Sequence, residues 1–359
     1  MQKVVLVVAL ALTLGGCGAA KVEMYRADAH NSGQFSDGVR SLHNLKWKFT
    51  TDSPINTSAV VSGDSVYFGN SAGKVFALNA EDGSERWRFN SGGPSGGAPA
   101  VSAGVVYIGS HDGRLYAIDD NTGQEKWRFS SSGSITTSPV LLDGILYFGN
   151  VAGDLYAVAA LDGTELWRYN SGAAVYSSPA VANGLVFFGN DDGLLFAVET
   201  GSGNERWRYR TDDKIHAAPM VYDDTVVVGS QDAALHAVDI KTGQQSWRYR
   251  AEGPINGAAT VKGNTLYFGA NDGYLYALEL DNQRAKWKYR VRDWVSGGVV
   301  MAGGQLYFGS YNNRLYAIDA DSGEEAWSFT TQGAITTSPV LSGGRIYIGS
   351  GDGALYAVQ

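Results

Sequence analysis

The sequence predicts an all-β fold, an eight-bladed β-propeller of four-stranded antiparallel blades, and three recurring residues lead to this prediction. A tryptophan, a glycine and an alanine each recur every 40 residues along the chain. The tryptophans are Trp47, Trp87, Trp127, Trp167, Trp207, Trp247, Trp287 and Trp327. The stretch ITTSPVL likewise occurs at 135–141 and again, five periods later, at 335–341. A fixed period of this length indicates one supersecondary unit copied in tandem.

One unit, residues 137–169, shows why each copy is expected to be a four-stranded sheet. Its apolar runs have the length of short strands and are bounded by turn residues such as Gly and Asp; they are 139–142, 145–149, 155–158 and 166–169. Short connections between them favour antiparallel pairing of neighbouring strands. A small sheet with two apolar faces must stack on others, and units of about 40 residues do so as the blades of a propeller.

The recurring residues receive structural roles. The tryptophan supplies an apolar plate that can wedge against the neighbouring blade, and alanine at 77 and its equivalents leaves room for it. Glycine at 69 and its equivalents allows close approach at a strand end. Asp-Gly pairs such as 112–113 supply the positive φ of a tight hairpin. Basic residues on the fourth strand, such as Arg88, favour protection of an exposed edge, with a polyanion-binding rim as the alternative.

The strand count predicts how the ring closes. Eight first strands are expected near residues 59, 99, 139, 179, 219, 259, 299 and 339, but the chain stops at Gln359 before an eighth C-terminal tryptophan segment. Residues 45–49, LKWKF, carry the fourth-strand signature with no blade before them. We therefore expect them to complete the last blade, so that the propeller spans residues 45–359.

The N-terminus predicts export and lipid anchoring. Lys3, an apolar run over 4–14 and two small residues follow the order of a secretory signal over residues 1–16, and the run is too short to span a bilayer. Leu14-Gly15-Gly16-Cys17 resembles the bacterial lipobox, in which the cysteine is acylated and becomes the first mature residue. We expect Cys17 to carry the lipid and 17–44 to form the tether; ordinary secretory cleavage is the alternative. With no second cysteine, no intramolecular disulfide can form.

Composition and charge exclude some classes of function. The formal net charge of −8 lacks the basic footprint that a sequence-independent nucleic-acid binder needs. The histidines at 216 and 236, 20 residues apart, have no third ligand at a recognisable spacing, so the sequence predicts no metal site.

The repeated pattern YFGxxDGxLYALDxxTGxxxWxF resembles the quinoprotein-type propeller repeat over about residues 25–359. That resemblance implies the propeller fold and leaves two functional branches. One contains quinone-dependent dehydrogenases, which hold pyrroloquinoline quinone and calcium over the axis. The other contains non-enzymatic lipoproteins of outer-membrane barrel assembly, the BamB-like group. The residue after the lipobox cysteine is Gly18 and not Asp. By resemblance to proteobacterial lipoproteins, this favours the outer membrane over retention in the inner membrane.

The residues expected at the axis favour the second branch. They start each first strand and are Asn56, Gly96, Thr136, Tyr176, His216, Asn256, Ser296 and Thr336. None is Asp or Glu, whereas calcium needs anionic oxygens and an oxidation needs a base. The sequence therefore predicts a protein that is not an enzyme and has no cofactor.

Two sectors depart from the repeat and are the candidates for partner binding. In 211–236, Asp212-Asp213-Lys214 and Ala233 replace turn residues of the repeat. Sequence drift within one blade is an equally good explanation of these replacements. In 281–298, Trp294 is the one tryptophan outside the 40-residue register. An unregistered Trp beside Arg has the composition of an interface hot spot. We hypothesise that Trp294 and Arg292, with Tyr176, His216 and Asn256, contact a partner; a Trp that caps the channel for stability is the alternative.

These observations favour a lipid-anchored, non-catalytic scaffold on the periplasmic side of the outer membrane, or on the cell surface if the organism has one membrane. Its partner would be an envelope protein such as a component of β-barrel assembly, bound by a monomer within a complex. The second hypothesis is a surface lipoprotein whose propeller mouth binds a glycan or small ligand. The third is a quinone-dependent oxidoreductase.

Overall fold

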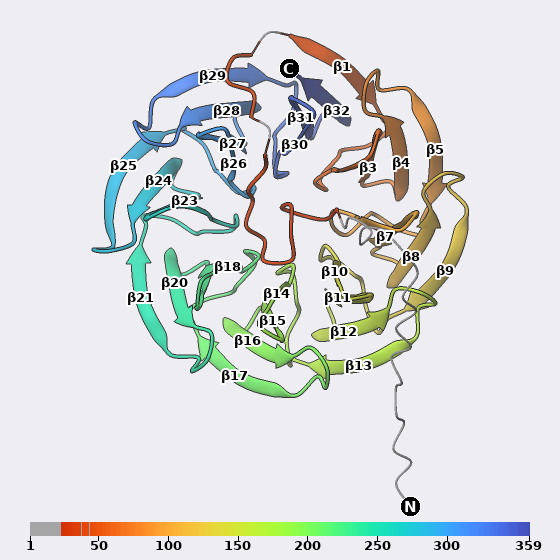
Figure 1. Ribbon diagram of the computed structural model, residues 1–359, viewed down its shortest axis with the longest axis horizontal. Coiled ribbons are helices and arrows are strands. Elements are labelled where there is room, and N and C mark those ends of the chain that lie inside the picture. Colours follow the sequence, from red (N-terminus) through yellow and green to blue (C-terminus); the bar gives the residue numbers. More distant parts are fainter. Residues whose placement is uncertain (1–22, 37, 43) are drawn as a thin grey trace, which may run out of the picture.

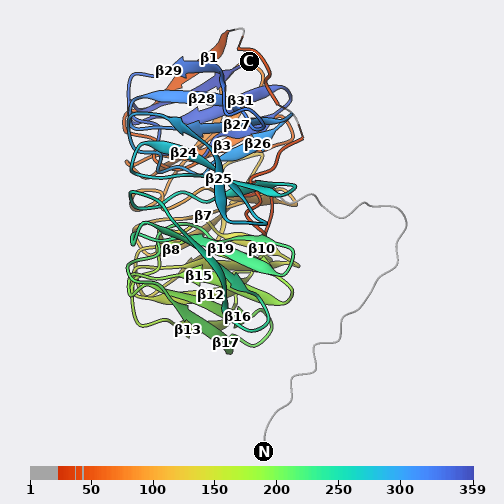
Figure 2. The same cartoon turned by 90° about the vertical axis from the view of Figure 1, so that its left-hand side faces the viewer.

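The computed structural model describes residues 23–36, 38–42 and 44–359, and Cys17 with the predicted signal peptide lies outside them. Eight four-stranded sheets surround a common centre, which confirms the eight-bladed propeller (Figure 1). Seen edge-on, the blades form a flat disc (Figure 2). The described residues form strands, turns and bends, and none of them forms an apolar helix long enough to cross a bilayer.

Each blade is an antiparallel meander whose first strand lies nearest the axis and whose fourth strand forms the rim. The first strands are β2 (Val60–Ser62), β6 (Ala100–Ser102), β10 (Val140–Leu142), β14 (Ala180–Ala182), β18 (Met220–Tyr222), β22 (Thr260–Lys262), β26 (Val300–Ala302) and β30 (Val340–Ser342). The second strands are β3 (Ser65–Gly69), β7 (Val105–Gly109), β11 (Ile145–Gly149), β15 (Leu185–Gly189), β19 (Thr225–Gly229), β23 (Thr265–Gly269), β27 (Gln305–Gly309) and β31 (Arg345–Gly349).

The outer half of each blade completes the sheet. The third strands are β4 (Lys74–Asn79), β8 (Arg114–Asp119), β12 (Asp154–Ala159), β16 (Leu194–Glu199), β20 (Ala234–Asp239), β24 (Tyr274–Glu279), β28 (Arg314–Asp319) and β32 (Ala354–Val358). The fourth strands are β5 (Glu85–Asn90), β9 (Glu125–Ser130), β13 (Glu165–Asn170), β17 (Glu205–Arg210), β21 (Gln245–Arg250), β25 (Arg284–Arg290), β29 (Glu325–Thr330) and, from the N-terminus, β1 (Leu45–Thr50).

The recurring tryptophan joins neighbouring blades, as predicted. Trp47 lies over the turn glycine Gly83 of the next blade, where a Cβ atom would collide with the indole. Its Nε1 donates a hydrogen bond to the carbonyl oxygen of Ala80 at 3.1 Å. Trp87 repeats both contacts one blade further, over Gly123 and to the carbonyl of Asp120. Glycine in the receiving turn therefore makes room for the indole, whereas the equivalent position after Trp247 carries Gln283, also at positive φ.

The recurring glycine at the end of the second strand also serves a contact between blades. A Cβ on Gly349 would collide with the side chain of Ile55, and one on Gly109 with that of Ile135. Both isoleucines are fully buried and precede the first strand of the next blade. The close approach predicted at this position is thus made by a side chain of the next blade.

The basic residues of the rim pair with groups of their own blade. Arg88 forms an ion pair with Glu85 at 2.6 Å and lies over the ring of Phe76, 5.9 Å from its centroid. Arg128 repeats this arrangement with Glu125 and Tyr116. These contacts favour the structural interpretation of the rim over a polyanion site.

The ring closes through the N-terminal strand, as predicted. Strand β1 pairs with β32 in the sheet β1-β32-β31-β30, and Trp47 lies opposite Ala357. Asn44 and Gln359 exchange two backbone hydrogen bonds of 3.0 Å each. The two ends of the described chain are therefore held in one blade.

Residues 23–36, which we call the plug segment, were predicted to belong to a tether but lie against the propeller. They run across the centre of one face of the disc, which we call the plug face (Figure 1). Glu23 and Val101 of β6 exchange backbone hydrogen bonds of 2.9 and 2.7 Å. Met301 of β26 donates to Gly33 and accepts from Phe35, both at 2.8 Å. The segment thus occupies free edges of first strands.

Val39 completes the seam between the last two blades. In five other blades the tryptophan Nε1 donates to the carbonyl 33 residues later, as Trp287 does to Ala320. For Trp327 that residue would be 327 + 33 = 360, beyond the last residue, Gln359. Trp327 Nε1 donates instead to the carbonyl of Val39 at 3.1 Å, and the Tyr307 hydroxyl donates to the same oxygen at 3.0 Å.

We predict that Trp47→Ala lowers the free energy of unfolding by about 3–5 kcal/mol, because it removes a buried aromatic plate from the closing blade. Trp294→Ala is the matched control, since its indole is half exposed and outside the register, and we expect a loss below about 1 kcal/mol. Urea unfolding followed by circular dichroism measures both. Equal losses in the two variants would contradict the structural role of the repeated tryptophan.

Candidate functional site

A polar depression of about 160 Å³ lies on the propeller axis. All eight residues predicted to ring the axis line it: Asn56, Gly96, Thr136, Tyr176, His216, Asn256, Ser296 and Thr336. Tyr25 of the plug segment also reaches it. The depression opens on the face opposite the plug, which we call the mouth face. The repeat brings one residue from each blade to this point because each first strand begins there.

The chemistry of this lining does not fit a quinone cofactor with its calcium ion. The residues around the depression are Ser, Thr, Asn, Gly, Ala, Tyr and His, with no Asp or Glu among those described. Calcium takes carboxylate and carbonyl oxygens, and small-molecule sites usually hold about 300–1,000 Å³. This depression offers neither the anionic ligands nor the volume.

His216 and Tyr176 meet at the rim of the depression. Their ring centroids are 5.1 Å apart, and 41% of Tyr176 is exposed. His216 Nε2 lies 2.7 Å from Asp191 Oδ1, and Lys214 Nζ donates to the other oxygen of that carboxylate at 2.9 Å. Burial opposes ionisation of Asp191, but the hydrogen bonds from Lys214 and His216 hold its pKa below the ordinary value. The cluster presents an aromatic surface beside a fixed ion pair.

Trp294 and Arg292 line a second hollow, of about 320 Å³, on the same face. Half of Trp294 is exposed, and its indole meets the ring of Tyr311 edge-on at 5.3 Å between centroids. The Trp294 carbonyl accepts hydrogen bonds from the Tyr311 amide at 3.1 Å and from Ser310 Oγ at 2.9 Å. The backbone beneath the indole is therefore fixed while the ring itself remains available.

Arg292 adopts a backbone conformation that is costly for a side chain. Its φ is +71°, in the left-handed region that glycine favours. The equivalent residue of another blade, Gly172, has φ +88°. A strained residue persists only where its surroundings hold it, and such residues cluster at functional sites.

The five predicted contact residues thus share the mouth face but divide between two hollows. Tyr176, His216 and Asn256 line the axial depression, whereas Arg292 and Trp294 line the peripheral hollow. Asn256 Oδ1 is buried without a hydrogen-bond partner in the described part of the chain. Whether a partner uses these residues remains a hypothesis.

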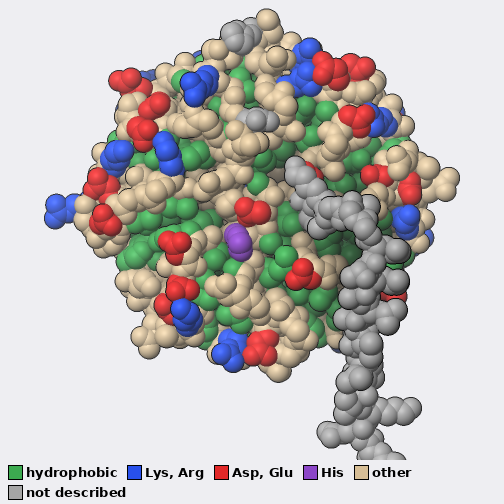
Figure 3. All heavy atoms as spheres, in the orientation of Figure 1, with side chains coloured by type: hydrophobic (Ala, Val, Ile, Leu, Met, Phe, Trp, Pro, Cys, Tyr) green, Lys and Arg blue, Asp and Glu red, His purple; other side chains and the backbone are tan. Residues whose placement is uncertain are grey.

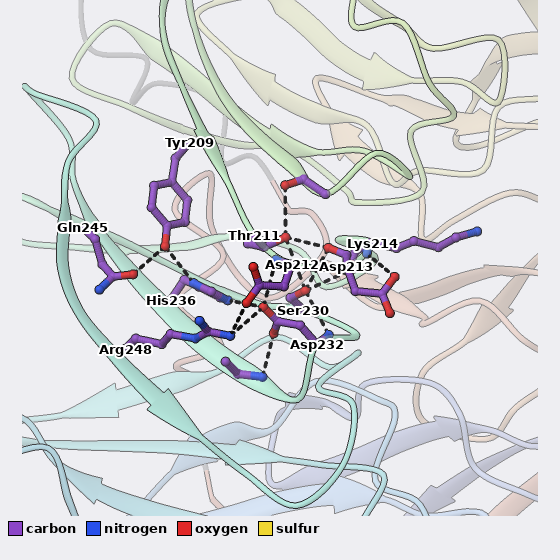
Figure 4. Close-up of polar contacts among 12 residues, drawn as sticks. Tyr209, Thr211, Asp212, Asp213, Lys214, Ser230, Asp232, His236, Gln245 and Arg248 are labelled. Carbon is purple, nitrogen blue, oxygen red and sulfur yellow. Dashed lines mark hydrogen bonds and ion pairs between the residues drawn. The ribbon is translucent and has the colours of Figure 1, made fainter.

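The other departing sector, residues 211–236, supplies His216 to the axial depression and also contains a buried polar network around His236 (Figure 4). His236 Nε2 lies 3.0 Å from Asp232 Oδ2, and its Nδ1 lies 2.9 Å from the Tyr209 hydroxyl. Arg248 also contacts Asp232, at 3.1 Å. Burial opposes ionisation, yet the hydrogen bonds from His236 and from the Asp212 amide lower the pKa of Asp232 from 3.8 to about 2.

The histidines at 216 and 236 do not share a site. His216 pairs with Asp191 and His236 with Asp232, two different carboxylates. Over residues 23–36, 38–42 and 44–359, no three side chains of His, Cys, Asp or Glu gather in a way that could hold a metal ion.

Sequence reasoning missed a large apolar hollow on the plug face, about 930 Å³ in volume, beside the plug segment. Leu142 and Leu161 line it, and Leu161 is 89% exposed. Figure 3 shows hydrophobic side chains between the charged ones of this face. The sequence carries a signal for this hollow, because both leucines depart from the repeat. Where Leu142 stands, the other blades have a polar or smaller residue or, in one case, Tyr222. Where Leu161 stands, they have a polar residue or glycine.

Eight regular four-stranded blades arranged in a ring define an eight-bladed β-propeller of the quinoprotein-like repeat class. The chain belongs to the family whose model is described as outer membrane protein assembly factor BamB, which matches residues 43–174 and 151–359. No curated protein sequence matches the chain.

Solved structures share the fold at low sequence identity. BamB from Moraxella catarrhalis is 19% identical, with a TM-score of 0.75 over 88% of this chain and 99% of that one. The quinohemoprotein alcohol dehydrogenase from Comamonas testosteroni is 16% identical, with a TM-score of 0.82 over 93% and 80%. The computationally designed Ika8 protein is 18% identical, with a TM-score of 0.78 over 90% and 99%. At such identities the likeness shows the fold and not the function.

We predict that Asp232→Asn destabilises the protein at pH 7 by about 1–3 kcal/mol, because the buried His236 and the exposed Arg248 both lose a charged partner. The lowered pKa means that the folded state binds fewer protons than the unfolded state, so this stabilisation is present above pH 3.8 and is lost as the pH falls to about 2. The free energy of unfolding, measured with urea at several pH values across this range, should therefore decrease less steeply with falling pH for the variant than for the wild type. Asp272→Asn, at the equivalent position, is the control; identical pH profiles for wild type and Asp232→Asn would contradict the assignment.

We predict that Arg292→Gly raises the free energy of unfolding by about 1 kcal/mol, because glycine adopts φ +71° without steric cost. Arg290→Gly is the matched control two residues earlier, at the end of β25, where glycine should destabilise the strand. Thermal unfolding compares the two. A loss of stability in Arg292→Gly would show that side-chain contacts outweigh the strain.

Proposed function

We propose that the protein is a lipid-anchored, non-catalytic scaffold that takes part in the assembly of β-barrel proteins in the outer membrane. The observation that carries this proposal is the half-exposed Trp294, held beside Tyr311 and Arg292 on the mouth face. Exposed aromatic residues next to arginine are the typical anchors of protein interfaces. Membership of the BamB family supports the envelope role.

The position of the plug segment supports different roles for the two faces: the plug face near the membrane and the mouth face toward a partner. Glu23 is fixed to β6 at the plug face and lies only six positions after Cys17. Six extended residues span about 20 Å, so an acyl group on Cys17 would keep the plug face near the membrane. The mouth face, with Trp294 and Tyr176, would then point toward the periplasm. A monomer could bind its partner there within a larger complex.

A second candidate function is the binding of a glycan or small ligand at the axial depression. Two observations favour it: the Tyr176 ring is exposed at the rim, and the buried Asn256 Oδ1 has no partner among the described residues. Aromatic faces and amide groups are suited to neutral polar ligands. The quinone-dependent oxidoreductase has no such support, because the lining does not fit the cofactor.

The proposed interaction predicts that a photocrosslinking residue at position 294 captures an outer-membrane barrel with periplasmic assembly domains in living cells. The matched control is a probe at Leu45, which is 45% exposed on the rim strand β1 and should capture little. Mass spectrometry identifies the captured protein and, separately, the acyl group on Cys17.

The outcomes separate the two candidate functions. Capture of the barrel at 294 and not at 45, lost in a variant that also carries Arg292→Ala, supports the scaffold. No capture at 294 by an acylated and folded protein would overturn it and favour the ligand-binding candidate. An unmodified Cys17 would overturn the anchor alone.

A further inference from the structure

Arg26 of the plug segment is a buried cation that lacks a contacting carboxylate, although the charge of Asp28 acts on it from a distance. Only 1% of the residue is exposed, and it forms no ion pair with a carboxylate of the described chain. Its Nε donates to the carbonyl of Asn31 at 3.1 Å, and its Nη2 donates to the carbonyl of Ala259. The Nη1 atom has no hydrogen-bond partner. An unpaired buried charge is costly, so this nitrogen calls for an explanation.

The unpaired Nη1 lies next to Gly298, one of the residues that line the axial depression. A Cβ atom on Gly298 would collide with Nη1 and with Ser338 Oγ, and both residues line the depression. The equivalent residue in every other blade is Ser or Ala, so a glycine here is specific to the blade that receives the guanidinium. Tyr25, the residue before Arg26, reaches Ser338 Oγ with its hydroxyl at 3.4 Å. The plug segment thus forms the floor of the depression.

Serine hydroxyls surround this floor in a consistent orientation. Each accepts a backbone N–H bond of 2.9 Å from the blade before it; they are Ser58, Ser138, Ser178 and Ser338. Ser58, Ser138 and Ser178 donate to no acceptor in the described chain. Each of these three hydroxyls therefore keeps a proton that it can donate to a ligand in the depression. The ring therefore presents donors to whatever occupies the depression.

We infer that the axial depression is a binding site for one small oxyanion, a phosphate, a sulfate or a carboxylate group. Hydroxyl donors and a guanidinium are the groups that recognise such anions in proteins. The lining offers no carboxylate that would repel one, and about 160 Å³ limits the ligand to a few heavy atoms. The bound anion would compensate the charge of Arg26. This inference does not depend on the lipid anchor or on Trp294.

The inference predicts saturable binding of inorganic phosphate or acetate to the purified protein, measured by titration calorimetry at constant ionic strength. Calorimetry is chosen because phosphate and sulfate also stabilise folded proteins non-specifically. Phosphate represents a free inorganic anion, and acetate represents the carboxylate of a metabolite or of a partner chain. Preference for one of the two identifies the kind of anion that the site takes.

Two variants locate the site. Ser58→Ala/Ser138→Ala/Ser178→Ala removes three donors and introduces the residue that three other blades already carry, at Ala98, Ala218 and Ala258. We expect the affinity to fall about tenfold for each hydroxyl removed. Arg26→Met removes the charge and fills similar space. Ser322→Ala, on an exposed outer turn, is the matched control and should bind like wild type.

Either of two results would overturn the inference: no saturable heat with phosphate, sulfate or acetate, or saturable binding that the triple serine variant retains unchanged. If Arg26→Met does not fold, the serine variant alone decides, because alanine is already accommodated at the same position of three blades.

Discussion

The contact between the rim tryptophan of one blade and the turn glycine of the next is the constraint on which the rest of the structure depends. A four-stranded sheet of this size has two apolar faces and cannot bury either alone. The indole of Trp47 covers the backbone at Gly83, and its N–H uses a carbonyl of the same turn. The contact recurs at six of the eight seams, so neighbouring blades are fixed to one another and the loops at the axis are held in a ring.

A ring built this way must be closed, and the N-terminal segment closes it in two places. Strand β1 supplies the missing fourth strand, and Val39 supplies the carbonyl that Trp327 and Tyr307 would otherwise lack. The same stretch of chain then crosses the plug face and carries Arg26 to the axis. Closure and the chemistry of the axial depression are therefore coupled, since the segment that completes the seam also forms the floor of the mouth.

The sequence was sufficient for whatever the repeat determines. The eight blades, the closing strand and the eight residues at the axis follow from the 40-residue period, because equivalent residues must occupy equivalent places in a ring. The N-terminal segment before β1 does not follow the repeat. Its sequence therefore does not indicate that Arg26 is buried or that the Val39 carbonyl accepts the hydrogen bond of Trp327. The apolar hollow could have been predicted from Leu142 and Leu161, but only by comparing the normally polar positions of the repeats as closely as the tryptophan positions.

Departures from the repeat have different physical meanings according to their burial. Around His236 the polar groups pair with one another and with Tyr209 of the preceding blade, so the network is explained by packing and hydrogen bonding. Around Trp294 the indole stays half exposed while its backbone is fixed, which packing alone does not require. Gly298 departs for a third reason, because a side chain there would exclude Arg26. A residue outside the register therefore indicates function only when its exposed or unpaired groups remain without a partner inside the blade.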